Sequence, residues 1–169
     1  FLDKDDIDDL VCLKFSAGTH ELLWSKQIEL SEGRSSYKYR IKGSTNGNVL
    51  VGLFTSAGAA QIADESLNPE KDYNGIHLIN FDLSADSFSH EFVPVYGYLY
   101  VNAIELSDKD LYFTGYSREK GTMGGVEFNK NTFNEIITGR INLEDGFKWV
   151  DSFSKTTNQN NEQGTSLVF

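Results

Sequence analysis

Short apolar runs alternate along the chain with clusters of Gly, Asn, Asp and Ser. Strands of an all-β protein follow one another in this way, separated by turns. We predict twelve strands, at 9–15, 22–28, 37–42, 49–54, 76–81, 90–95, 98–105, 111–116, 125–129, 135–141, 147–153 and 166–169. Helical periodicity is weak: the best helical segment, 56–66, contains Gly58, which favours a surface loop.

Few of these strands alternate between apolar and polar residues. Residues 10–13 read Leu-Val-Cys-Leu, and residues 49–54 read Val-Leu-Val-Gly-Leu-Phe. A sheet with one exposed face would need a polar residue at every second position, so these runs predict sheets that are covered on both faces. The blades of a β-propeller are covered in this way, because each packs between two others.

Three stretches look like copies of one unit, each with a Phe in an apolar strand before a polar turn. They are centred on Phe15, Phe81 and Phe128. Strands that end in Gly52 and Gly115 follow the first two, and Gly164 stands where the third would end. The twelve strands therefore fall into three groups of four, each expected to run as a meander. A long insert at about 57–73 accounts for the greater length of the first unit.

The first unit has an Asp-led apolar strand from Asp9, a Trp24-Ser25 strand, and a Gly47-Asn48 turn into a strand that ends in Gly52. This order is similar to the bacterial-type β-propeller repeat often called SBBP. The second unit lacks the Trp, and the third keeps little beyond 126–129 and Gly164. The resemblance implies four-stranded blades in a secreted or cell-surface protein that scaffolds and binds. It offers no catalytic residue to carry over.

We therefore expect residues 1–169 to form a single all-β repeat domain of about three propeller-like, four-stranded antiparallel blades, with a β-sandwich as the alternative. Propellers usually have about four to eight blades. The chain also stops on the apolar run 167–169, which would leave an open edge. We expect a segment of a larger propeller or assembly, whose edges are covered by the rest of a longer chain or by other copies.

The composition of the chain limits the classes of partner that it is expected to bind. The formal net charge of −10 repels phosphate backbones and anionic lipid heads, so we expect no nucleic acid partner. No run approaches the roughly 18 apolar residues of a membrane span, so we expect no membrane insertion. Cys12, the only cysteine, lies between Val11 and Leu13 and is expected to be a buried thiol.

The acidic lead Asp3, Asp5, Asp6, Asp8 and Asp9 offers oxygen ligands of the kind that calcium accepts. The spacing of an EF-hand is absent, and charge runs are ordinarily solvated, so we expect no cofactor, with calcium as the open alternative.

The three histidines, His20, His77 and His90, stand at no spacing that is typical of ligands or nucleophile partners. His77 lies between Ile76 and Leu78 and is predicted to be a core histidine.

Residues 142–149 look like a degenerate Asp-box, the turn of sialidase-like propellers, with Asn142 and Glu144 at the two key polar positions. That motif is structural, so it supports the fold more than an activity. The chain's four arginines form no cluster for a substrate carboxylate, and no pair of carboxylates stands out for glycoside hydrolysis. We expect no enzyme and no catalytic residue.

Four tyrosines, Tyr96, Tyr98, Tyr100 and Tyr116, are the candidates for exposed aromatic side chains. Tyr98 and Tyr100 share one face of a predicted strand, so they could stack on a sugar or anchor a protein partner, with core packing as the competing role. The expected function is a non-enzymatic scaffold or protein-interaction module that binds protein partners, including copies of itself. The alternative is a carbohydrate-binding or glycosidase-type propeller. An extracellular or cell-surface location follows from the resemblance alone.

Overall fold

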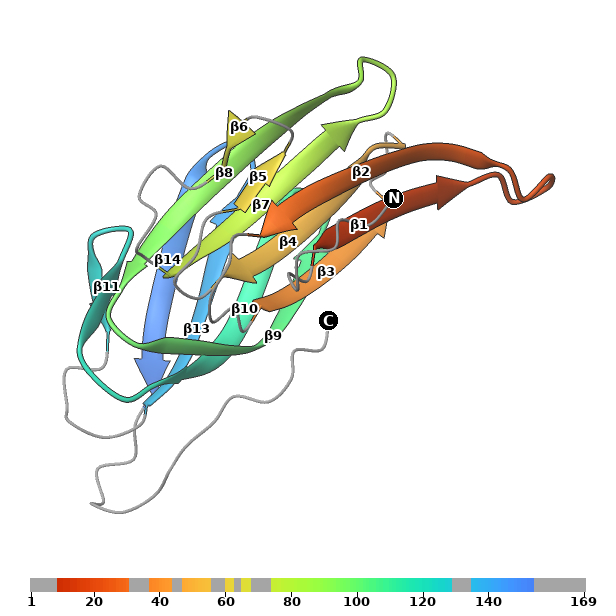
Figure 1. Cartoon of the computed structure of the whole chain (residues 1–169). Coiled ribbons are helices and arrows are strands. Elements are labelled where there is room, and N and C mark those ends of the chain that lie inside the picture. The colour runs from red at the N-terminus through yellow and green to blue at the C-terminus, as the bar shows by residue number, and fades with distance from the viewer. Residues whose placement is uncertain are drawn as a thin grey trace.

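The computed structural model describes residues 9–30, 37–43, 47–55, 60–62, 65–67, 74–128 and 135–153. Within these ranges the chain is all-β, and every strand pairs antiparallel in one of three sheets (Figure 1). Eleven of the twelve predicted strands coincide with observed ones to within a few residues, and the twelfth, 166–169, lies outside the described residues. The described residues include no helix that is long and apolar enough to cross a membrane.

The first sheet contains β1 (Leu10–Phe15), β2 (Leu22–Leu30), β5 (Ala60–Ile62) and β6 (Glu65–Ser66), in that order. The two short strands lie inside the segment that the sequence assigned to a loop. That assignment is wrong for β5 and β6, because Ala60, Ile62 and Leu67 are buried under the first sheet's apolar face. Strands of two or three residues are too short to show a period.

The middle sheet has six strands: β3 (Tyr37–Gly43), β4 (Val49–Thr55), β7 (Asn74–Asp82), β8 (Ser87–Tyr96), β11 (Gly121–Met123) and β12 (Val126–Phe128). Their order is β12-β11-β8-β7-β4-β3. The third sheet has the order β14-β13-β10-β9 and contains β9 (Leu99–Ser107), β10 (Asp110–Ser117), β13 (Glu135–Asn142) and β14 (Gly146–Phe153).

The predicted grouping of strands is wrong, although the strands themselves are right. The middle sheet joins the last two strands of the first predicted group to the first two of the second, so that β3, β4, β7 and β8 form one meander. The next meander is β9, β10, β13 and β14. The three Phe strands are not equivalent: Phe15 lies in β1 at the edge of the first sheet, Phe81 in β7 inside the middle sheet, and Phe128 in the short β11–β12 hairpin at the edge of the middle sheet. An apolar pattern identifies strands, but it does not say which neighbours pair.

The centre of the middle sheet is buried on both faces, as the run at 49–54 predicted. The same prediction is wrong for the run at 10–13, because the first sheet is covered on one face only and leaves Val11 and Leu13 37% and 52% exposed. Every residue of β4 is buried. One face packs on the third sheet through the side chains of Leu50, Phe54, Ile76, Leu78, Val93, Ile104, Leu111, Phe113, Ile137 and Ile141. The other face packs on the first sheet through Val49, Val51, Leu53, Ile79, Phe81, Leu10, Cys12, Ile28 and Leu30. Each such side chain contributes roughly 1.5–3 kcal/mol on burial, so the two interfaces are the main source of stability.

Two positions show how tightly the layers pack. A Cβ atom on Gly52 would lie 2.7 Å from Cδ1 of Leu111, so the absence of a side chain in β4 lets the third sheet approach. On the other face Cys12 is 1% exposed, which confirms the buried thiol. Its burial raises the pKa of the thiol to about 11.

Three hairpin turns, one in each sheet, share one geometry. They follow β1, β7 and β13 and begin at Ser16, Asp82 and Asn142. In each turn the side-chain oxygen of the first residue accepts a hydrogen bond from the backbone N–H three positions later. The residue four positions later has a positive φ: 58° at His20, 48° at Asp86 and 71° at Gly146. Short polar side chains that bond their own backbone favour such turns.

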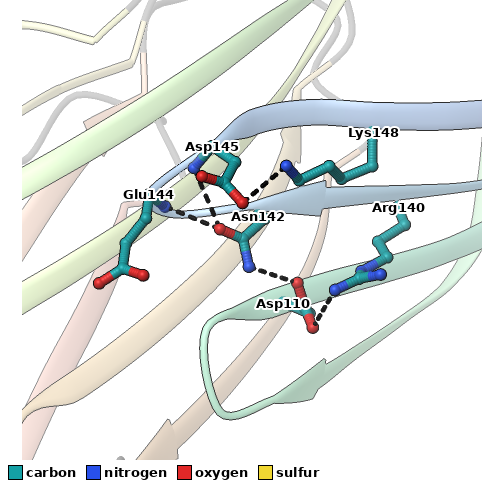
Figure 2. Close-up of polar contacts among 6 residues, drawn as sticks. All are labelled: Asp110, Arg140, Asn142, Glu144, Asp145 and Lys148. Carbon is teal, nitrogen blue, oxygen red and sulfur yellow. Dashed lines mark hydrogen bonds and ion pairs between the residues drawn. The ribbon is translucent and has the colours of Figure 1, made fainter.

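The third of these turns occupies the segment that looks like an Asp-box, and it carries a polar network (Figure 2). Oδ1 of Asn142 accepts hydrogen bonds from the backbone N–H groups of Glu144 and Asp145, at 3.0 and 3.1 Å. Its Nδ2 donates to Oδ1 of Asp110 at 2.7 Å, and Nη2 of Arg140 donates to the other oxygen of Asp110 at 2.9 Å. The network ties β10 to the β13–β14 turn, which is a structural role.

Candidate binding site at the Tyr96–Tyr98 turn

The tyrosines singled out in the sequence meet at one end of the molecule, where β8 leaves the middle sheet and β9 enters the third. Tyr100 in β9 pairs with Tyr116 in β10, and their ring centroids are 5.2 Å apart. Tyr98 precedes β9, and its ring and that of Tyr116 both contact Arg118. Tyr98 is 38% exposed and Tyr100 is half-buried, whereas Tyr116 is only 6% exposed. The prediction of an exposed Tyr116 is wrong, because Tyr98, Tyr100 and Arg118 surround its ring.

Arg118 lies over this aromatic group. Its Cζ is 5.6 Å from the ring centroid of Tyr98 and 5.5 Å from that of Tyr116. Contacts of this kind attract a cation to the ring faces and restrict its orientation. Burial, followed by the neighbouring Tyr116, raises the pKa of the Tyr98 hydroxyl above its usual value, so this group stays protonated and can donate a hydrogen bond.

The 96–98 turn is fastened to the segment that follows β10. Oγ of Ser117 lies 2.6 Å from the carbonyl oxygens of both Tyr98 and Glu119. Gly97 has a φ of 102°, and a Cβ atom there would lie 2.7 Å from the carbonyl oxygen of Lys120. Only glycine fits this position without strain, so the two segments are held in close contact.

A pocket of about 320 Å³ opens beside this turn. Its walls come from β8, from the β11–β12 hairpin and from the chain between β10 and β11. The lining residues are Tyr96, Gly97, Lys120, Gly121, Thr122, Glu127 and Phe128. The lining thus combines two aromatic residues with a threonine, a lysine and a glutamate, a set that suits a small ligand with both a flat body and polar groups. The sequence indicated the tyrosines and the strand of Glu127 and Phe128, but it did not indicate Lys120 or β11, because β11 is only three residues long.

A second cluster is a pair of histidines that the sequence did not bring together. His77 is fully buried, as predicted for a core histidine, and shares hydrogen bonds of 3.2 Å with Oγ1 of Thr55 and with Nε2 of His90. Burial, and then the neighbouring His90, lower the pKa of His77 to about 3, while burial lowers that of His90 to about 4. Both rings are thus neutral near pH 7, and Phe92 packs on His77 at 4.7 Å.

No group of three or more His, Cys, Asp or Glu side chains within the described ranges is arranged to hold a metal ion. Asp3, Asp5, Asp6 and Asp8 of the acidic lead lie outside those ranges. Asp9 accepts hydrogen bonds from Nε2 of Gln27 and from the backbone N–H of Leu30, so it fastens the start of β1 to the end of β2.

The outer face of the β1–β2 hairpin carries exposed apolar side chains along β1 and near the turn, beside the polar Ser25 and Gln27 that lie opposite Leu13 and Val11. Val11, Leu13 and Phe15 alternate along β1 with the buried Leu10 and Cys12, so they point away from the middle sheet. Together with Leu22 and Leu23 of β2 they are between 37% and 59% exposed. We call these five side chains the β1–β2 outer face.

Comparison with protein-family models, with curated proteins and with solved structures finds no match to the chain.

Proposed function

We propose that the chain is a non-enzymatic scaffold and protein-interaction module that binds further copies of itself through the β1–β2 outer face. The observation that carries this proposal is the exposure of five large apolar side chains on one sheet face. Contiguous apolar surface of this kind on a folded protein ordinarily marks an interaction site.

The chemistry of this face matches the contacts that already hold the three sheets together. Those contacts consist of aliphatic and aromatic side chains from both partners. The lysines of the same hairpin do not interrupt the face: Lys26 pairs with Asp86 of the middle sheet at 2.8 Å, and Nζ of Lys14 donates to the carbonyl oxygen of Gly47. A further sheet can therefore pack on the five apolar side chains without burying either lysine, while Asp9 and Glu29, on the same side of the hairpin, accept hydrogen bonds from Gln27 and Gln61.

A propeller-like series of blades is part of this proposal, with a β-sandwich as the alternative. Two complete meanders of four strands, three sheets in succession and the shared turns at Ser16, Asp82 and Asn142 support it. The location outside the cell or at its surface is likewise a proposal, carried by the resemblance of the first unit.

The test is light scattering of the purified chain over a concentration series, with a double variant Leu13→Ser/Leu23→Ser. We expect the mass of the wild-type chain to rise with concentration and that of the double variant to stay at one protomer. Trp149→Ser is the matched control, since Trp149 is similarly exposed but lies on β14 of the third sheet, and it should associate as wild type does. A wild-type chain that remains monomeric up to millimolar concentration contradicts the proposal.

Saccharide binding at the 96–98 turn is the second candidate function. The observation in its favour is the pocket beside Tyr96, with Thr122 and Glu127 available as hydrogen-bonding partners for sugar hydroxyls. Tyrosine rings provide the apolar face on which a pyranose can stack. Glu127 is the one carboxylate among the lining residues, whereas glycoside hydrolysis ordinarily uses a pair, so binding fits the pocket better than hydrolysis does.

A further inference from the structure

We propose that β3, an outermost strand of the middle sheet, accepts a further strand from an acidic, extended segment of a partner protein (Figure 1). This surface is separate from the β1–β2 outer face, so the proposal goes beyond self-association. Three properties of β3 carry it: the regularity of its pairing with β4, its exposure on both faces and its pattern of charges.

The pairing of β3 is regular, unlike that of the other long edge strands. Among the described residues these strands are β1, β9 and β14, and the register of each with its neighbour contains a shift. Such irregularities bend a strand and make its edge a poor partner for another strand. β3 pairs with β4 over all seven of its residues without a shift, from Tyr37 opposite Thr55 to Gly43 opposite Val49. A regular edge of this length can hydrogen-bond with an added strand.

The side chains of residues 38–42 are exposed on both faces of β3. Tyr39 and Ile41, each 44% exposed, lie opposite Leu53 and Val51. Leu53 and Val51 are buried in the interface with the first sheet, so that sheet covers β4 and leaves β3 accessible. A strand added to β3 would find an apolar surface beside it on this face.

The opposite face of β3 carries Lys38, Arg40 and Lys42, in a chain whose formal net charge is −10. Lys38 has no ion-pair partner among the described residues. Nε of Arg40 lies 3.9 Å from Oε2 of Glu105, and the Arg40 side chain is 58% exposed. Nζ of Lys42 donates to the carbonyl oxygen of Leu106, which is a neutral group. One carboxylate beside three cations leaves this face positively charged.

The charges determine which kind of strand fits. Two copies of β3 paired antiparallel about Arg40 would place Lys38 opposite Lys42 and Arg40 opposite Arg40, and like charges in opposite positions destabilise a sheet. Cations on an edge strand keep identical edges apart in this way. A strand that alternates Asp or Glu with apolar residues would make the same contacts favourable, with its apolar face beside Tyr39 and Ile41. The pattern therefore favours an acidic partner over a second β3.

Isothermal titration of the full chain tests the proposal, with three eight-residue peptides as probes. The first peptide alternates Asp with Val, and the second alternates Lys with Val. The third is the acidic peptide with Pro in place of its two central Val residues, so it keeps the charge and loses backbone donors. We expect the acidic peptide to bind at least tenfold more tightly than either of the other two.

A charge reversal on β3 gives the matched test. Lys38→Glu should weaken binding of the acidic peptide at least tenfold. Lys109→Glu makes the same change at an exposed position beside β10 of the third sheet, and it should bind the peptide as wild type does. Leu13→Ser/Leu23→Ser should also bind as wild type does, so failure of self-association would not affect this result. Near-ultraviolet circular dichroism establishes that each variant is folded.

Hydrogen exchange locates the added strand. Saturation with the acidic peptide should slow the exchange of backbone amides within residues 38–42, because an added strand hydrogen-bonds with this edge. Unchanged exchange there would overturn the proposal. If these amides instead become protected as the concentration of the chain alone rises, a second copy occupies the edge and the acidic partner is wrong.

Three results of the titrations would also overturn the proposal. The first is absence of binding by the acidic peptide at millimolar concentration. The second is equal binding of the acidic peptide and either of the other two, which would show that charge or strand pairing has no part in recognition. The third is equal weakening by Lys38→Glu and Lys109→Glu, which would show a general effect of net charge.

Discussion

At the scale of single residues, His77 is the group whose ionisation the fold opposes most strongly. It lies in the face of the middle sheet that the first sheet covers, between Thr55 and His90, where a charged imidazole would have no water around it. Its pKa of about 3 and that of about 4 for His90 are far below the usual value of 6.5. The unfolded chain therefore binds protons on these residues at a pH where the folded chain does not.

We predict that the free energy of unfolding falls as pH is lowered from about 6.5 toward 4. Each histidine with a lowered pKa contributes a slope of about 1.4 kcal/mol per pH unit in that window, and the stability is fully present above it. Urea unfolding at pH 7 and pH 5 measures the difference. His77→Phe should reduce the slope, whereas His20→Gln, at an exposed turn, should leave it unchanged.

An identical slope in wild type and His77→Phe would contradict this account. The carboxylates of Asp82 and Asp145 do not confuse the comparison, because hydrogen bonds from Ser84 and Lys148 lower their pKa below 3.8. Burial raises the pKa of Glu91, which acts in the opposite direction at the acid end of the window but equally in both proteins.

Part of this residue-level chemistry could be predicted from the sequence. The apolar neighbours of His77 predicted its burial. Its contact with His90 was not predictable, because it depends on the β7–β8 register, in which Ile79 lies opposite His90 and His77 is the diagonal neighbour. Tyr116 was misjudged for a related reason: a tyrosine in a strand is exposed or buried according to what crosses its face, and here Arg118 does.

At the scale of elements, the hairpin turns determine how the chain reverses direction and enters the next strand. Asn142 connects its own turn to another strand, since its side chain serves two backbone N–H groups of the turn and also Asp110 of β10. Its side chain is nearly buried, so the groups that it satisfies would have few other partners.

We predict that Asn142→Ala lowers the free energy of unfolding by about 2 kcal/mol, since two or three hydrogen bonds of roughly 1 kcal/mol are lost. Thermal and urea unfolding provide the measurement. Glu144→Ala serves as the control from the same turn, because its ion pair with Lys109 is exposed and should contribute less than about 1 kcal/mol. Equal effects of the two substitutions would show that the network of Figure 2 is not what stabilises the turn.

The elements themselves were largely predictable, and their partners were not. Strands such as β4 and β7 can be recognised in the sequence by their runs of apolar residues. The three that were missed, β5, β6 and β11, have two or three residues each and owe their conformation to a neighbouring strand. Which strand belongs to which sheet depends on where the chain crosses between layers, and the polar turns at these crossings resemble those within hairpins.

At the scale of the whole molecule, stability resides in two apolar interfaces on either side of the middle sheet. Phe54 is 1% exposed and belongs to the interface with the third sheet. Leu13 is 52% exposed on the β1–β2 outer face. The run at 49–54 predicted this double coverage before the layers were known.

We predict that Phe54→Ala costs about 3–5 kcal/mol, because it removes a ring from a packed core and leaves a cavity. Leu13→Ala should cost less than about 0.5 kcal/mol in the monomer, in keeping with exposed positions generally. Urea unfolding at low protein concentration, where association is absent, measures both. Comparable losses in the two variants would mean that Leu13 has a buried partner within the chain.

Cys12 is buried between the first and middle sheets, so the reactivity of its thiol reports on the opening of that interface. A thiol reacts as its thiolate, and a pKa of about 11 together with nearly complete burial keeps that species scarce and shielded. An alkylating reagent can therefore reach the thiol only when the β1–β2 hairpin separates from β4 and β7. Cys12 is the one cysteine in the sequence, so the labelling rate measures how often the interface between the first and middle sheets opens. The interface between the middle and third sheets can stay closed during such an opening.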